Sequence, residues 1–163
     1  MAYKLKILPK QELLVLAYSR EVLPSDFDEF WRAISVSPDY SPDFDDLVLL
    51  GPSTDFSEVS WDLTDKEAGK FVESFKSLTP SREKRCAFIC ADKVLGAMAK
   101  MYGAYIHSRS PENVLIEQFA TLDQALDWID ASKGASRKLD RAHIIKLLGQ
   151  MGEQWCLRRS AAA

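Results

Sequence analysis

The sequence predicts an α/β fold, with a five-stranded mixed sheet flanked by about four helices and followed by a C-terminal amphipathic helix. Three observations predict this class. Alternating residues 3–7 and an apolar run at 13–18 resemble the strands of a hairpin, later strands alternate with segments of helical periodicity, and residues 86–91 are apolar on both faces, as in a buried parallel strand. A chain of 163 residues with 47% apolar content can bury a core without a metal or disulfide.

The first fifty residues contain the elements expected of the first half of such a sheet. Alternating residues 3–7 and the apolar run 13–18, separated by a proline turn, predict a hairpin. Ser25 is the expected N-cap of a helix, because apolar residues then recur on one helix face until a stop near Ser37. Residues 47–50 predict a third strand behind a loop rich in proline and aspartate.

Two capping boxes mark helix starts further along the chain. The T-x-x-E pattern at 64–67 precedes one apolar stripe, and the T-x-x-Q pattern at 121–124 precedes another. The runs 86–91 and 114–119 predict the fourth and fifth strands, and Asp92 is placed to cap the helix that follows the fourth. Strand and helix therefore alternate as α/β architecture requires.

The pattern divides the chain into a domain at 1–131, a linker at 132–138 and a basic C-terminal helix and tail at 139–163. The helix is expected over about 139–158, with an apolar stripe at helical spacing. The stripe consists of Ile144, Leu148, Met151 and Trp155. It must be buried against the chain's own body, against a second copy in a homodimer, or against another protein.

Charge is distributed unevenly along the chain, although the formal net charge is only −3. Residues 1–131 carry 14 Lys and Arg against 22 Asp and Glu, whereas residues 132–163 carry 7 against 2. Such a basic tail folds back on its acidic body, docks on an acidic partner, or stays solvated. An acidic body repels phosphates, so we expect no nucleic-acid partner.

Neither targeting nor cofactor signals stand out. The start of the chain lacks the regions of a signal peptide, and no apolar run approaches the roughly 20 residues that span a bilayer, so we expect a cytoplasmic protein without stable membrane insertion. Cys86, Cys90 and Cys156 lack zinc-ligand spacing and are interpreted as buried or inert thiols. We expect no metal and no cofactor.

The stretch CAFICADKVLGAMAKMYGAY at 86–105 is rich in small residues after its strand. A dinucleotide-binding turn is disfavoured, because the connection at 91–93 contains no glycine and an acidic N-cap opposes a phosphate. Packing of the helix against a neighbour is the favoured interpretation. The candidate interface or pocket residues are Gly96, Met98, Ala99, Met101, Tyr102, Gly103 and Tyr105.

Three stretches together resemble the STAS-like family (SpoIIAA-like, or anti-sigma-factor antagonist-like), which overlaps with Sec14-like lipid-binding folds. They are DYSPDFDDLVLL at 39–50, RCAFICADKVLGAMAKMYGAY at 85–105 and ENVLIEQFATLDQALDWI at 112–129. The resemblance implies a small bacterial, non-enzymatic module that binds a regulatory protein partner. The alternative is a carrier or sensor of an apolar, lipid-like molecule, with a pocket lined by Phe71, Phe75, Met98, Met101, Tyr102 and Tyr105.

The resemblance also implies a phosphorylated hydroxyl after the third strand. In anti-sigma-factor antagonists a Ser there is modified by the partner kinase, and the matching region here is GPSTDFSEVSWDLT. The candidates are Ser53, Thr54, Ser57 and Ser60. The family's compact Asp-Ser loop is not reproduced, because Gly51 and Pro52 precede the first hydroxyl, and the alternative is that all four hydroxyls are caps and turn formers.

Catalysis is not expected. The acidic cluster of Asp39, Asp43, Asp45 and Asp46 lacks the spacing of a calcium loop and is interpreted as a solvated acidic loop. His107 and His143 accompany no nucleophile motif.

Overall fold

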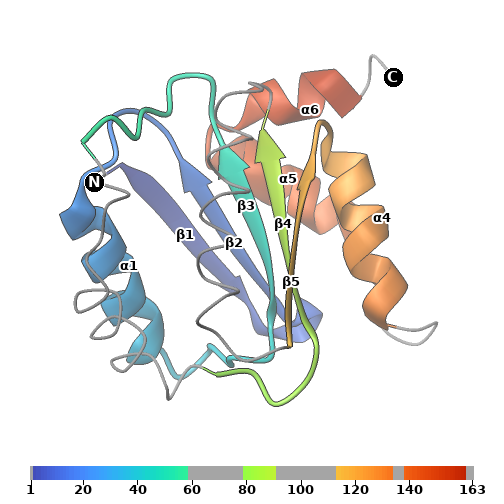
Figure 1. Ribbon diagram of the computed structural model, residues 1–163. Helices are drawn as coiled ribbons and strands as arrows, with labels where there is room; N and C mark the ends of the chain where they lie inside the picture. Colours follow the sequence, from blue (N-terminus) through green and yellow to red (C-terminus); the bar gives the residue numbers. More distant parts are fainter. Residues whose placement is uncertain (1, 59–78, 91–112, 134–137, 161–163) are drawn as a thin grey trace.

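The computed structural model describes residues 2–58, 79–90, 113–133 and 138–160. Its centre is a five-stranded sheet in which the strands lie in chain order, from β1 to β5 (Figure 1). The strands are β1 (Tyr3–Leu8), β2 (Leu13–Tyr18), β3 (Asp45–Leu50), β4 (Lys84–Cys90) and β5 (Val114–Phe119). Only β1 and β2 are antiparallel, and every later strand is parallel to the one before it. The predicted α/β class with a mixed sheet is confirmed.

The predicted hairpin is confirmed, and its turn is hydrogen-bonded to the third strand. The short 3-10 helix η1 (Pro9–Gln11) connects β1 to β2, whose register pairs Leu8 with Leu13. Glu12 adopts a left-handed conformation with φ 50° at this turn. Its carbonyl oxygen accepts a hydrogen bond from the Asp45 amide at 3.0 Å, so the hairpin turn also fixes the start of β3.

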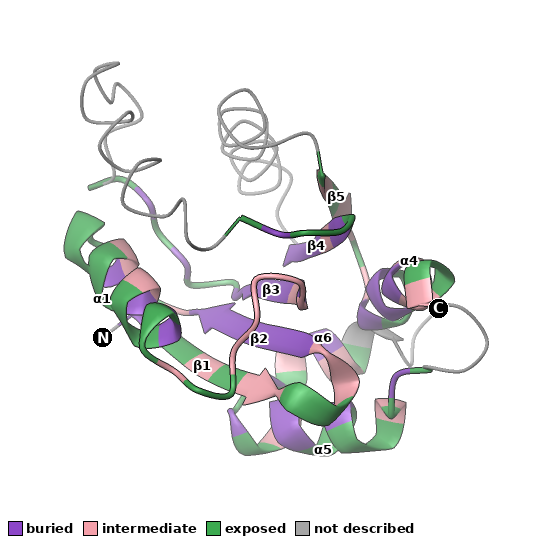
Figure 2. Ribbon diagram, turned by 90° about the horizontal axis from the view of Figure 1, so that it is seen from below, coloured by how far each residue is buried: buried purple, intermediate pink, exposed green. Residues whose placement is uncertain are grey.

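The sheet separates two cores. Because side chains alternate across a strand, Leu13 and Val15 of β2 face one core while Leu14 and Leu16 face the other. The first core is completed by α4 (Leu122–Lys133), α5 (Arg141–Gln150) and α6 (Gln154–Ser160), and the second by α1 (Pro24–Ser35). Figure 2 shows β2 and β3 buried between these layers. None of the described helices is both long and apolar enough to cross a membrane.

Helix α1 begins earlier than predicted, with Leu23 rather than Ser25 at the N-cap. Pro24 occupies the first helical position, where its fixed φ and missing N–H cost nothing. The cap carboxylate comes from Asp26, which accepts from the Leu23 amide at 2.9 Å and the Ala2 amide at 3.2 Å. Asp26 therefore joins the helix start to the beginning of the chain, which a local capping pattern does not reveal.

The capping prediction holds at α4. Thr121 Oγ1 accepts from the Gln124 amide at 3.3 Å, as its T-x-x-Q pattern indicates. The pattern at 64–67 and the expected cap at Asp92 lie outside the described residues.

The predicted single helix over 139–158 is wrong, because the segment forms two helices. A Schellman motif ends α5: Gly152 is left-handed at φ +83°, its amide donates to Gly149 O at 3.1 Å, and the Glu153 amide donates to Leu148 O at 2.9 Å. The chain then turns and begins α6 at Gln154. Gly152 supplies the backbone conformation that this turn requires.

The apolar stripe of the C-terminal segment packs on the chain's own sheet. Ile144 and Leu148 are fully buried and Met151 is buried, all in the core that contains Leu47 of β3, while Trp155 packs at the edge of that core. Arg141 pairs with acidic residues of α4, including Asp130 at 3.0 Å. The basic tail therefore folds back on the acidic body. The homodimer through this stripe stays a prediction.

Candidate functional site

The carboxyl end of β3 continues into a tight turn whose tip is exposed. Gly51 to Thr54 form a β-turn with Pro52 and Ser53 at its centre, closed by a hydrogen bond from the Thr54 amide to Gly51 O at 3.0 Å. The carbonyl of Tyr18, at the end of β2, accepts from the Gly51 amide at 3.0 Å and from Thr54 Oγ1 at 2.8 Å. One carbonyl thus holds both ends of the turn.

We call residues 51–58 the β3 loop. The residues after the turn are also held by backbone hydrogen bonds. The Asp55 amide donates to Arg20 O at 2.9 Å, and Asp55 O accepts from the Val22 amide at 2.7 Å. Phe56 is buried beside Tyr18, with ring centroids 6.0 Å apart. The loop is therefore a fixed extension of the sheet, in which buried anchors alternate with exposed side chains.

The four candidate hydroxyls differ in their surroundings. Ser53 and Ser57 are exposed, whereas Thr54 is buried and its hydroxyl donates a hydrogen bond to Tyr18 O. Ser60 lies outside the described residues. Thr54 matches the alternative interpretation of a turn former, and Ser53 is exposed at the centre of the turn.

Helix α6 approaches this loop through Trp155. A Cβ atom built on Gly51 would lie 3.8 Å from Trp155 Nε1, 3.7 Å from Thr54 Oγ1 and 3.1 Å from Tyr18 O. The position of Trp155 in an apolar stripe does not reveal this proximity, because Trp155 and Gly51 are about a hundred residues apart in the chain. The position of Gly51 directly after a strand was the one local signal of a close approach.

The acidic cluster is not the solvated loop that we expected. Asp39 is exposed, but Asp43 receives hydrogen bonds from the Ser81 amide at 2.6 Å and its hydroxyl at 2.7 Å, and these bonds lower the pKa of Asp43. Asp45 and Asp46 open β3 and lie on opposite sides of the sheet, each facing a lysine. The prediction failed because both cationic partners come from distant elements.

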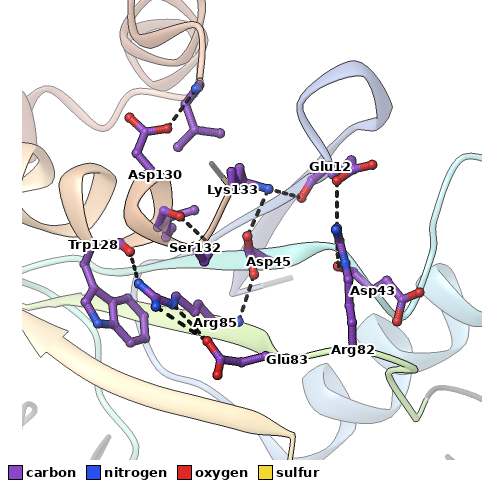
Figure 3. A network of polar contacts seen from close by, with 12 residues as sticks. Glu12, Asp43, Asp45, Arg82, Glu83, Arg85, Trp128, Asp130, Ser132 and Lys133 are labelled. Carbon is purple, nitrogen blue, oxygen red and sulfur yellow. Dashed lines mark hydrogen bonds and ion pairs between the residues drawn. The ribbon is translucent and has the colours of Figure 1, made fainter. Parts of the chain in front are cut away.

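Asp45, at the amino-terminal end of β3, forms a buried ion pair with Lys133 of α4. Its Oδ2 lies 2.9 Å from Lys133 Nζ, and the two side chains are only 5% and 4% exposed. Asp45 Oδ1 accepts from the Arg85 amide at 2.8 Å, and Lys133 also donates to Glu12 O at 3.3 Å. Figure 3 shows Lys133 reaching from the end of α4 to the Asp45 carboxylate. The pair joins α4 to three strand ends.

The Asp46 carboxylate forms a second pair on the face that carries α1. Its Oδ2 lies 2.9 Å from Lys84 Nζ, which also donates to the Tyr40 hydroxyl at 3.2 Å. Burial raises the pKa of Asp46 despite the nearby lysine. Burial alone lowers the pKa of Lys84, but Asp46 and Tyr40 raise it above its ordinary value, so the lysine stays charged at neutral pH.

Asp45 and Asp46 are thus each paired with a lysine inside the fold. Within the part of the chain that the structure describes, no group of three or more His, Cys, Asp or Glu side chains could hold a metal ion. His143 is exposed on α5, and its amide donates to the helix cap Asp140 at 3.0 Å. The His143 Nδ1 atom lies 3.4 Å from Gln11 Nε2, and His107 lies outside the described residues.

The candidate interface or pocket on the small-residue stretch also lies outside the described residues. This applies to Gly96, Met98, Ala99, Met101, Tyr102, Gly103 and Tyr105, and to Phe71 and Phe75. The expected apolar carrier stays a prediction.

Comparison with known proteins gives one structural similarity. The chain is similar to an uncharacterised protein of the DUF3478 family from Shewanella loihica, which has a SpoIIAA-like fold; the two share 13% identity over 78% of this chain and 93% of that one, with a TM-score of 0.47. A similarity at this TM-score carries no argument about fold or function. No family model and no curated protein matches the chain.

The three cysteines are all buried, as the sequence analysis predicted. Burial, followed by the nearby Glu153 charge, raises the pKa of Cys156 from 9.0 to about 12. Burial also raises the pKa of Cys86. A thiol whose pKa is raised by folding favours the folded state fully below pH 9, and this contribution is lost as the pH rises from 9 towards 12.

We therefore expect the folded protein to resist thiol reagents at pH 8. A disulfide-exchange reagent such as DTNB should label all three cysteines in urea but less than one equivalent within minutes in buffer, because buried neutral thiols react only through opening. Rapid labelling of one thiol in the native protein would contradict its burial.

Proposed function

We propose that the chain is a non-enzymatic protein-binding module whose contact surface is the β3 loop, and that modification of Ser53 switches this contact. The observation that carries the proposal is the β-turn at 51–54, whose two ends are both hydrogen-bonded to Tyr18 O while Pro52 and Ser53 at its tip are exposed. A rigid scaffold that presents an exposed loop is a common arrangement for binding residues.

The rigidity of the loop favours recognition. A turn that is already ordered loses little conformational entropy when a partner binds, so more of the contact energy appears as affinity. Proline at the second position of the turn restricts the chain further, and the Thr54 hydroxyl fixes the base.

Charge explains how a phosphate at Ser53 would act. It would add about −1.5 to −2 charges beside the exposed Asp55 and Glu58 of the same loop. The local surface would become more strongly acidic, so an acidic partner would be repelled. The hydroxyl of Thr54 is the poorer acceptor, because its modification requires the bond to Tyr18 O to break.

We expect Ser53→Asp to weaken partner binding at least tenfold while Ser53→Ala leaves it within about twofold. The test is affinity capture from cell extract with quantitative mass spectrometry, comparing the proteins retained by wild type and by each variant. Ser35→Asp is the matched control, since Ser35 is an exposed serine at the end of α1. Circular dichroism confirms that each variant is folded.

The outcome is decided by the difference between variants. Proteins that are retained by wild type, Ser53→Ala and Ser35→Asp but lost with Ser53→Asp support the β3 loop as the contact surface. An identical set of retained proteins for all four chains removes the loop from the interface.

A further inference from the structure

We propose that the β3 loop and helix α6 form one coupled unit, in which Trp155 is the positioning residue. A change in the loop then alters the local stability of α6, and a change in α6 alters the local stability of the loop. This inference rests on the proposed function for the importance of the loop and adds its regulation by the C-terminal segment. Three sets of contacts carry it.

The first is the crowded space beside Gly51. The missing side chain of Gly51 leaves room for Tyr18 O, Thr54 Oγ1 and Trp155 Nε1, all within 4 Å of the position that a Cβ would occupy. The base of the turn and the indole nitrogen therefore border the same small space. A shift of the turn by a fraction of an ångström changes the space available to the indole.

The second is the set of bonds that fixes the indole. Trp155 Nε1 donates to Glu153 Oε2 at 2.7 Å, and the Glu153 side chain is only 4% exposed. Its other oxygen lies 3.7 Å from Lys4 Nζ, and the same ammonium donates to Met151 O. A buried carboxylate is costly without its partners, so Glu153 holds the indole ring and the start of β1 in one arrangement.

The third is the attachment of α6 itself. Among the described side chains of this short helix, Cys156 is fully buried, and Leu157 and Trp155 pack at the edge of the core. A seven-residue helix has little stability of its own, so its position depends on tertiary contacts such as these. Loss of the Trp155 contact should therefore loosen α6 before the rest of the fold, and thermodynamic linkage makes the effect reciprocal.

Hydrogen exchange of the full chain, read by mass spectrometry on the isolated protein, tests the coupling. Gly51→Ala places a methyl group 3.1 Å from Tyr18 O and forces the turn to move slightly. We expect amides of residues 154–160 to exchange at least threefold faster. Trp155→Phe removes the indole donor, and we expect it to speed exchange at the Gly51 and Thr54 amides by a similar factor.

Gly149→Ala is the matched control, because a Cβ there meets nothing within 4 Å. It should leave exchange in the loop and in α6 unchanged. Coupling is overturned if Gly51→Ala affects only the loop and Trp155→Phe affects only α6. If Gly51→Ala fails to fold, exchange at the Gly51 and Thr54 amides in Trp155→Phe tests the coupling on its own: faster exchange supports it, and unchanged exchange overturns it.

The two proposals fail in different ways. Exchange is measured without a partner, so reciprocal changes establish the coupling even if Ser53→Asp leaves captured proteins unchanged. Conversely, loss of capture by Ser53→Asp without reciprocal exchange supports the loop as a binding surface and removes α6 from its regulation.

Discussion

Replacing Asp45 by Asn should lower the free energy of unfolding by about 3–5 kcal/mol, the range for breaking a buried ion pair by removing one partner. The asparagine oxygen can still accept from the Arg85 amide, so the loss comes mainly from Lys133, whose ammonium would keep its charge in a site only 4% exposed. Urea denaturation followed by circular dichroism measures the change at pH 7.

A second substitution separates the charge from the shape of the site. In Asp45→Asn/Lys133→Met the unpaired ammonium is gone and a side chain of similar length fills its place, so we expect most of the lost stability to return. Asp39→Asn is the control for an exposed acid and should change stability by less than about 0.5 kcal/mol. A loss below about 1 kcal/mol for Asp45→Asn alone would show that water reaches the pair.

Truncating Leu148 to Ala should cost about 2–5 kcal/mol, because it empties part of the core between α5 and the sheet. Leu148 is 0% exposed and shares this core with Leu47 and Ile89. The measurement is again the urea midpoint, combined with the slope of the transition to confirm that the native state stays compact.

The control lies three residues earlier in the same helix. Ile145 is an aliphatic residue of the same size but is 42% exposed, so Ile145→Ala should cost less than about 1 kcal/mol. Equal effects of the two substitutions would mean that α5 does not pack on the sheet through its predicted stripe. A large effect of Ile145→Ala alone would indicate that its outer face is covered by a partner.

Much of the fold could be predicted because its signals are local. The alternation at 3–7, the two-sided apolar run of β4 and the Thr121 cap each depend on residues close together in the chain. The break between α5 and α6 was missed because Met151 and Trp155 continue the period of the stripe across it. Gly152 was the available signal, since glycine in a left-handed conformation commonly ends helices.

The candidate site was predictable only in outline. Gly51 and Pro52 signal a turn after β3, and the resemblance to STAS-like proteins directs attention to its hydroxyls. Which hydroxyl is buried depends on the carbonyl of Tyr18, in a different strand. Likewise the sequence shows that Asp45 and Asp46 are acidic but not that two lysines from β4 and α4 neutralise them.

The order of the strands has a consequence for synthesis on the ribosome. Each strand pairs with the one translated just before it, so the sheet can grow as the chain emerges. The face that carries Leu13 and Leu47 is different, because its cover includes Ile144 and Leu148 of α5, which are translated much later. The part of that face that α5 covers stays exposed in the nascent chain until α5 leaves the exit tunnel, and transiently exposed apolar surface of this kind favours aggregation.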